Sequence, residues 1–154
     1  MSVAMALLVL VHTLGATIWV GGMFFAYLVL RPVAGGLDPT VRLRLWRGVF
    51  QKFFPWVWAS IATLLLSGYT MILVAGGFGA VGLHVHAMQL VGLVMMALYL
   101  HLVFAPWRRF RLAVDAGEIP EAGAQLGQIR RIVGINLTLG LLTIAIGASG
   151  RWWG

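Results

Sequence analysis

Four long runs of apolar residues, separated by short polar connections, dominate the pattern of the chain. Each run reaches the roughly 20 residues that a helix needs to cross a bilayer. We therefore expect an all-α integral membrane protein, an antiparallel four-helix transmembrane bundle whose short connections join successive helices. The expected spans cover residues 3–31, 53–76, 83–107 and 130–150, in a single domain over residues 1–154.

Basic residues gather in two of the three connections. The first and third connections carry five each, whereas the glycine-rich second connection carries none and the C-terminal end has only Arg151. Because cytoplasmic loops are enriched in Lys and Arg, this pattern puts both basic connections inside and both termini outside, in the periplasm. We expect a multi-pass protein of a bacterial inner (plasma) membrane. The net charge of +7 is then a topology signal, so the expected partner is the lipid bilayer and not a nucleic acid.

The first connection contains its own helical signal. Asp38 followed by Pro39 is typical of a helix N-terminus. Val41, Leu45 and Val49 then recur at a spacing of four, with arginines between them. Residues 39–51 are therefore an amphipathic segment, either a short helix on the inner membrane surface or an early start of the second span.

Composition narrows the chemistry that the chain can perform. Hydrophobic residues make up 61% of the chain and charged residues only 10%, far below the roughly one quarter of a soluble domain. Cysteine is absent, which excludes disulfides and thiolate metal sites. The four carboxylates all lie in the basic connections, which argues against a proton-driven transporter built on membrane carboxylates.

Histidines inside apolar spans are the strongest candidates for a functional site, because a polar ring in hydrocarbon needs a partner. At 1.5 Å per helical residue, His12 lies roughly 28 Å above Arg31. By the same measure His86 lies roughly 33 Å above Arg108, and His101 only about 10 Å above it. The two histidines of similar depth, His12 and His86, are the expected axial ligands of a b-type haem, with His84 as a substitute for His86 and His101 as a less favoured alternate.

Small and aromatic residues surround His12 on its own helix. Gly15, Ala16, Trp19 and Gly22 share its face. The small residues would let a flat porphyrin approach the backbone, and Trp19 could pack on its edge. The same small residues also serve close helix packing. Arg151, with the amides of the glycine loop, is the candidate partner for haem propionates at the outer surface.

Copper is the alternative ligand of these histidines. His84 and His86 stand close together in the sequence, and with His12 they could hold a transition metal. The seven methionines add soft thioethers suited to Cu(I), Met88 among them, although methionine is also a common gap-filler in apolar cores. A third hypothesis is a structural subunit whose histidines only pack.

Two stretches resemble a known family. The first is His12 with Trp19, Val20, Gly21 and Gly22, and the second is the tail from Arg131 to Gly147. Both resemble the first and last spans of the copper-resistance CopD family of membrane proteins. CopD membership implies a copper-related function by association.

The layout is also similar to the HemJ-type protoporphyrinogen oxidase, a four-span protein thought to use b-type haem. Its first-span histidine and tryptophan would fall on His12 and Trp19. Its third-span motifs would fall on the stretches 83–86 and 99–101, with His86 where the oxidase has lysine.

The function expected from the residues is electron transfer or a membrane redox reaction linked to quinone, porphyrin or a redox partner protein. Two histidine ligands would leave no open site on the iron and favour electron transfer. Binding by His12 alone would leave a face open and favour a haem-dependent oxidoreductase. The alternative function is a copper-binding or copper-transport protein of CopD type. A homodimer is compatible with a bundle of only four spans.

Overall fold

The computed structural model describes residues 3–152, apart from the side chain of Arg151. In this part of the chain there are helices and turns but no strands. Four helical segments are long and apolar enough to cross a membrane: Val3–Ala34, Pro39–Val74, Leu83–Ala116 and Ile119–Ser149. The prediction of an all-α, four-span membrane protein is therefore confirmed.

Two of the four segments change their helical pitch part of the way along. The first segment consists of α1 (Val3–Phe24), the π-helical turn η1 (Phe25–Leu30) and α2 (Arg31–Ala34), and the second is α3 (Pro39–Val74). The third consists of α4 (Leu83–Leu102), the π-helical turn η3 (Val103–Trp107) and α5 (Arg108–Ala116), and the fourth is α6 (Ile119–Ser149). Two 3₁₀ turns, η2 (Phe78–Ala80) and η4 (Gly150–Trp152), complete the described chain.

Local chemistry explains where the helices begin, widen and end. Asp38 caps α3, because its Oδ1 accepts a hydrogen bond of 2.9 Å from the backbone N–H of Thr40. Pro106 lies inside η3, where a residue without an N–H interrupts the regular helical bonding. Gly117 ends α5 in the left-handed conformation, with φ of 75°, which glycine adopts without strain.

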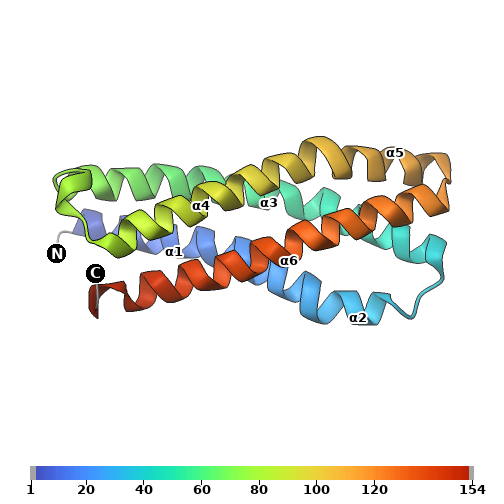
Figure 1. The fold of residues 1–154 in the computed structure, drawn as a ribbon, viewed down its shortest axis with the longest axis horizontal. Coiled ribbons are helices and arrows are strands. Elements are labelled where there is room, and N and C mark those ends of the chain that lie inside the picture. Colours follow the sequence, from blue (N-terminus) through green and yellow to red (C-terminus); the bar gives the residue numbers. More distant parts are fainter. Residues whose placement is uncertain (1–2, 153–154) are drawn as a thin grey trace.

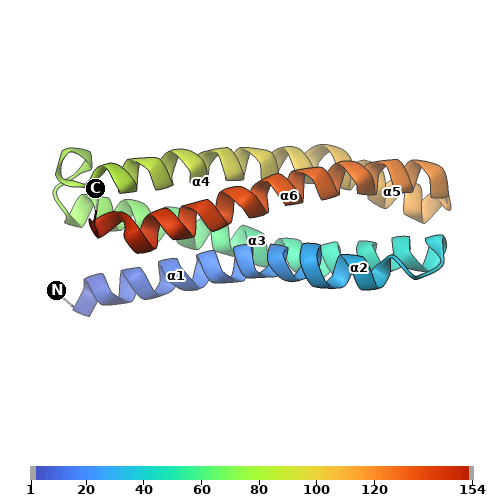
Figure 2. The ribbon, with the colours of Figure 1, turned by 60° about the horizontal axis from the view of Figure 1, so that its bottom comes forward.

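The helices run back and forth between two ends of an elongated bundle (Figures 1 and 2). Both termini and the loop between α3 and α4 lie at one end, which we name the terminal end. The connection between α2 and α3 and the turn between α5 and α6 lie at the other, which we name the basic end. Within the bundle α1 packs mainly on α3, and α4 mainly on α6.

Helices in the structure are longer than the spans expected from hydropathy. Residues 39–51 form the first turns of α3 without a break, so the amphipathic segment and the second span are one helix. In the same way α5 and the first turns of α6 continue past the apolar runs at the basic end. The difference arises because hydropathy locates the part of a helix that suits lipid, whereas capping residues such as Asp38 and Gly117 decide where the helix ends.

Aromatic side chains fill the bundle towards the basic end. Phe50 and Phe54 of α3 stack with ring centroids 5.4 Å apart, and Trp107 packs edge-on against both. Phe110 is fully buried beside them, and Tyr99 donates a hydrogen bond of 3.1 Å to the carbonyl of Phe54. This aromatic cluster fills the space between α3, α4 and α5 in this half of the bundle.

Two of the glycines expected near a cofactor face α3 instead. A Cβ at Gly15 would lie 3.5 Å from the backbone oxygen of Ser60 in α3, which is ordinary contact. At Gly22 any Cβ would overlap the ring of Phe53, also in α3. Gly22 therefore lets α1 approach α3 closely, as small residues do in membrane bundles, whereas at Gly15 a methyl group would fit in ordinary contact with α3.

Candidate functional site

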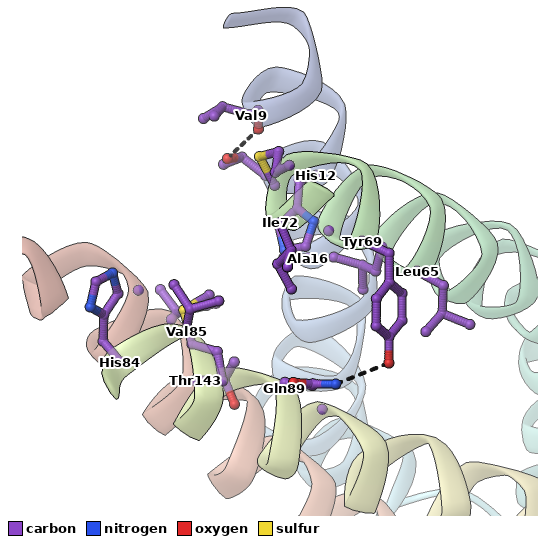
Figure 3. A pocket seen from close by; sticks show the side chains of 18 of the residues that line it. Val9, His12, Ala16, Leu65, Tyr69, Ile72, His84, Val85, Gln89 and Thr143 are labelled. Carbon is purple, nitrogen blue, oxygen red and sulfur yellow. Dashed lines mark hydrogen bonds between the residues drawn. The ribbon is translucent and has the colours of Figure 1, made fainter. Parts of the chain in front are cut away.

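A cavity of about 660 Å³ lies between α1, α3, α4 and α6 (Figure 3). This volume is within the range of roughly 300–1,000 Å³ typical of small-molecule sites. Residues from all four membrane-spanning segments line it, and most of them are apolar. None of the lining residues is an aspartate, glutamate, lysine or arginine, so the cavity carries no fixed charge of its own.

His12 of α1 lines this cavity and is held by α3. Its Nδ1 lies 2.9 Å from the hydroxyl oxygen of Ser67. The Ser67 hydroxyl donates its single proton to the carbonyl oxygen of Thr63, 2.6 Å away. Ser67 can therefore only accept from His12, which means that Nδ1 carries the imidazole proton and Nε2 carries the lone pair. Metal-binding histidines are usually held in this way, since a hydrogen bond at one ring nitrogen fixes the tautomer and orients the other nitrogen towards the metal.

Gly68 provides the space that the His12 ring occupies. A Cβ at this position would lie 3.2 Å from Cε1 of His12 and 3.6 Å from Nδ1. The first distance is tighter than ordinary van der Waals contact, so an alanine here would push the ring. Ser67 and Gly68 together position the imidazole, one by a hydrogen bond and one by the absence of a side chain.

His84 lines the same cavity from α4 (Figure 3). Its ring packs on Gly150, where any side chain would overlap it. The structure therefore brings His12 and His84 to one cavity from different helices.

His86 and His101 do not line the cavity. Both are exposed on the surface of the bundle, and the ring of His86 lies 6.1 Å from that of Phe78. Since α4 begins at Leu83, both His84 and His86 are helical, and residues two apart on a helix point to different faces. The pair expected from depth, His12 with His86, is thus not brought together, and the substitute His84 takes its place.

Methionines are concentrated at this cavity. Five of the seven in the chain line it. They come from three helices: Met5 of α1, Met71 of α3, and Met88, Met95 and Met96 of α4. The cavity therefore combines two imidazoles with five thioethers, a set of neutral donors of which the thioethers are soft.

A hydrogen bond between α4 and α3 joins the residues that follow Met88 and Gly68. Nε2 of Gln89 donates to the hydroxyl of Tyr69 over 3.1 Å (Figure 3). Tyr69 follows Gly68, which touches His12, and Met88 precedes Gln89. Met88 lines the cavity one helical turn from His84 on the same face of α4, and its thioether packs on Gly147 of α6, where a Cβ would lie 3.2 Å from Sδ.

The remaining residues expected at the site divide into two groups. Ala16 and Trp19 line the cavity, as expected, whereas Gly15 and Gly22 face α3. The side chain of Arg151 lies outside the described residues. Sequence reasoning missed Ser67 and Gly68, and the only signal for either was a small residue within an apolar span.

The protein ligands available here differ from those of common divalent-metal sites. In the part of the chain that the structure describes, no three residues of the types His, Cys, Asp and Glu come together as a metal site. Hard or highly charged cations need anionic oxygen or several imidazole ligands. A neutral cavity lined by thioethers and imidazoles suits a soft ion of low charge, or a large neutral group.

Fold and cavity together define a four-span membrane protein with a cavity rich in soft ligands near its terminal end. Residues 47–149 match the family model described as Copper resistance protein D, CopD. Because the match covers well over half of the chain, the protein belongs to the CopD family. The matched region includes most of α3 and all of α4 and α6, and it begins after His12. Neither the curated proteins nor the solved structures compared with the chain gave a match.

Proposed function

We propose that the protein binds copper(I) within the membrane, in the cavity lined by His12 and the methionines, and that it handles copper as cargo. The observation that supports this most strongly is the gathering of five methionines and two histidines around one uncharged cavity. Thioether and imidazole are the protein donors that select Cu(I) when thiolates are absent. The family to which the chain belongs is independently related to copper.

The proposed primary ligand is Nε2 of His12, because Ser67 holds the proton on Nδ1. Met88 is the proposed thioether ligand, since it lines the same cavity from α4 and its neighbour Gln89 bonds to Tyr69, which follows the Gly68 that contacts His12. Met5, Met71 and His84 lie on the lining nearer the terminal end, and Met95 and Met96 lie deeper on α4. Soft donors at several depths would let a copper ion exchange ligands stepwise along the cavity.

The direction of access follows from which half of the bundle is filled. The aromatic cluster around Phe50, Phe54 and Trp107 fills the bundle beyond the cavity on the basic side. Copper would therefore enter from the terminal end. By the positive-inside rule we propose that this end faces the periplasm of a bacterial inner membrane, because the arginine-rich connections lie at the other end.

A Cu(I) titration of the detergent-purified protein tests this function. The protein competes for copper with a chromogenic Cu(I) chelator under reducing conditions. The expected result is about one tightly bound copper per chain in the wild type, and binding weaker by at least about tenfold in His12→Ala and Met88→Leu.

Matched controls separate ligand loss from general damage. His101→Ala removes an exposed histidine outside the cavity, and Met23→Leu removes a buried methionine outside it. Both should bind copper as the wild type does. Wild-type affinity in His12→Ala, or equal loss in all four variants, would overturn the proposal.

Haem b is the second candidate, favoured by the size of the cavity. A volume of about 660 Å³ exceeds what a bare ion needs, and His12 and His84 both reach it. The lining contains no arginine or lysine for the propionates, which is the weakness of this candidate. If it is bound, haem would supply a one-electron redox centre. The quinone, porphyrin or redox partner protein expected from the sequence would then exchange electrons with it.

The visible spectrum of the purified protein distinguishes the two candidates. A Soret band that shifts on reduction, lost in His12→Ala, would favour haem over copper. A colourless protein with stoichiometric copper favours the main proposal. The homodimer expected from the sequence remains a prediction under either.

A further inference from the structure

A second polar cluster lies at the basic end, away from the copper cavity. A cleft of about 20 Å³ is lined there by the end of the first segment, α3 and α6. Its polar lining residues are Tyr27, Arg31, Trp46 and Arg130. The volume is enough for one water-sized group, such as a single oxygen atom of a larger ligand.

The donors at this cleft lack acceptors. Nε of Arg130 and Nε1 of Trp46 are buried and have no hydrogen-bond partner in the described part of the chain. Within the described residues, Nε of Arg42 is also buried without a hydrogen-bond partner. The positive charges of Arg42 and Arg31 both act on Arg130. A buried donor without an acceptor is destabilising, by about 1–3 kcal/mol and by more for charged groups, and such groups in native proteins call for a missing partner.

Positive charge at the cleft is not balanced by carboxylates. Nowhere in the described chain does a carboxylate form an ion pair with Arg31, Arg42 or Arg130. By contrast Arg47, one turn along α3, pairs with Asp115 through Nε at 2.8 Å and Nη2 at 2.9 Å. Arg31 instead stacks on Tyr27, with Cζ 4.8 Å from the ring centroid. Two guanidinium groups, those of Arg31 and Arg130, thus line the cleft, and the charge of Arg42 also acts on Arg130. An anion bound there would satisfy donors that no carboxylate of the described chain reaches.

The position of the cleft along the bundle indicates which kind of anion it would bind. Arg31 directly follows the apolar run that ends at Leu30, and Arg130 with Arg131 directly precedes the run that begins at Ile132. Both arginines therefore lie where the lipid-facing surface ends, which is the depth of the phospholipid headgroups. Basic pockets between membrane helices at this depth suit phosphate-bearing headgroups.

We propose that the cleft lined by Arg31, Arg130 and Trp46 binds a phosphate group, and that its source is the headgroup of an anionic phospholipid. Arginine fits a phosphodiester because its planar N–H donors can bond two phosphate oxygens at once. One phosphate oxygen would enter the cleft and accept from Trp46 and Arg130. The remaining phosphate oxygens would face Arg31.

Native mass spectrometry of the full chain, released from nanodiscs of phosphatidylcholine containing phosphatidylglycerol, tests this site. The wild type is expected to retain one phosphatidylglycerol. Arg130→Gln should retain it at least about fivefold less, because a charge-assisted pair of bonds is lost. Arg131→Gln is the matched control, since it removes the same charge from the exposed neighbouring position.

A second variant and a second ligand complete the test. Trp46→Phe removes only the indole donor and should reduce retention of phosphatidylglycerol, but by less than Arg130→Gln does. This variant tests the site even if Arg130→Gln does not fold. Inorganic phosphate added to the detergent-solubilised protein distinguishes the source. Displacement of lipid by millimolar phosphate would show that the site accepts free phosphate as well, which supports the phosphate chemistry. Equal retention in the wild type, Arg130→Gln and Trp46→Phe would overturn the proposal, as would equal loss in Arg130→Gln and Arg131→Gln.

Discussion

Nδ1 of His12 lies 2.9 Å from Oγ of Ser67, so α3 holds the one histidine of α1 by a hydrogen bond. Because the Ser67 hydroxyl donates its hydrogen bond to the carbonyl oxygen of Thr63, it accepts from Nδ1 of His12, which leaves Nε2 of the imidazole unprotonated. His12 is half-buried at the cavity lining, which leaves Nε2 as the proposed donor to a metal.

Removal of the Ser67 hydroxyl should weaken copper binding without unfolding the protein. In Ser67→Ala the ring loses its orienting partner, and we expect Cu(I) affinity to fall by about 10- to 100-fold, as for other partners of metal-bound histidines. Chelator competition measures the change. Thr70→Ala is the control, since its hydroxyl bonds only to Leu66 of its own helix. Unchanged affinity in Ser67→Ala would show that the bond to His12 has no part in binding.

Crowding the His12 imidazole with a methyl group should also weaken copper binding, but by less than removal of the Ser67 hydroxyl. Gly68→Ala puts a methyl group 3.2 Å from Cε1 of His12, so the ring must move by a few tenths of an ångström. We expect Cu(I) affinity to fall by about tenfold. Gly92→Ala is the matched control, because Gly92 also lines the cavity but has open space around its Cα. Equal affinities in the two variants would contradict the assigned position of the ring.

Stability should depend on one of two adjacent glycines in α1. Gly22→Ala forces a methyl group into the ring of Phe53, and overpacking of this kind destabilises by about 1–3 kcal/mol. Gly21→Ala meets nothing within 4 Å and should leave the free energy of unfolding nearly unchanged. Unfolding in a denaturing-detergent titration compares the two. Similar stability of both variants would mean that α1 and α3 do not pack this closely.

The ion pair between Arg47 and Asp115 joins α3 to α5 at the basic end. Its side chains are 28% and 52% exposed, so water screens the attraction. Asp115→Asn should therefore lower the free energy of unfolding by no more than about 1 kcal/mol, and by less at high salt. A loss well above this value that persists at high salt would show that the pair does more than join two helices.

Much of the fold followed from local signals in the sequence. Apolar run length predicted four spans, and Asp38 with Pro39 marked a helix start that the structure has. The helical overhang at the basic end was not visible in hydropathy, because a helix outside the lipid is held by tertiary contacts such as those of Phe110.

The site was predictable only in part. Depth along the chain selected His12 and preferred His86 to His84, whereas the structure has His84 at the cavity. Depth does not report which face of α4 a residue occupies, because the rotation of α4 about its axis is set by packing against α6. Gly150 leaves room for the ring of His84, so this histidine faces the bundle. The convergence of methionines from three helices could not be read from the sequence, since each of them also fits an ordinary apolar core.

X-ray absorption at the copper edge tests whether His12 and a methionine bind copper, because it reports the atoms bound to the metal. For the wild type loaded with one Cu(I), we expect the atoms bound to copper to include both thioether sulfur and imidazole nitrogen. In His12→Ala the nitrogen contribution should fall and in Ser67→Ala it should become disordered. A first shell without sulfur, or one unchanged by His12→Ala, would contradict the assignment of this cavity as the copper site.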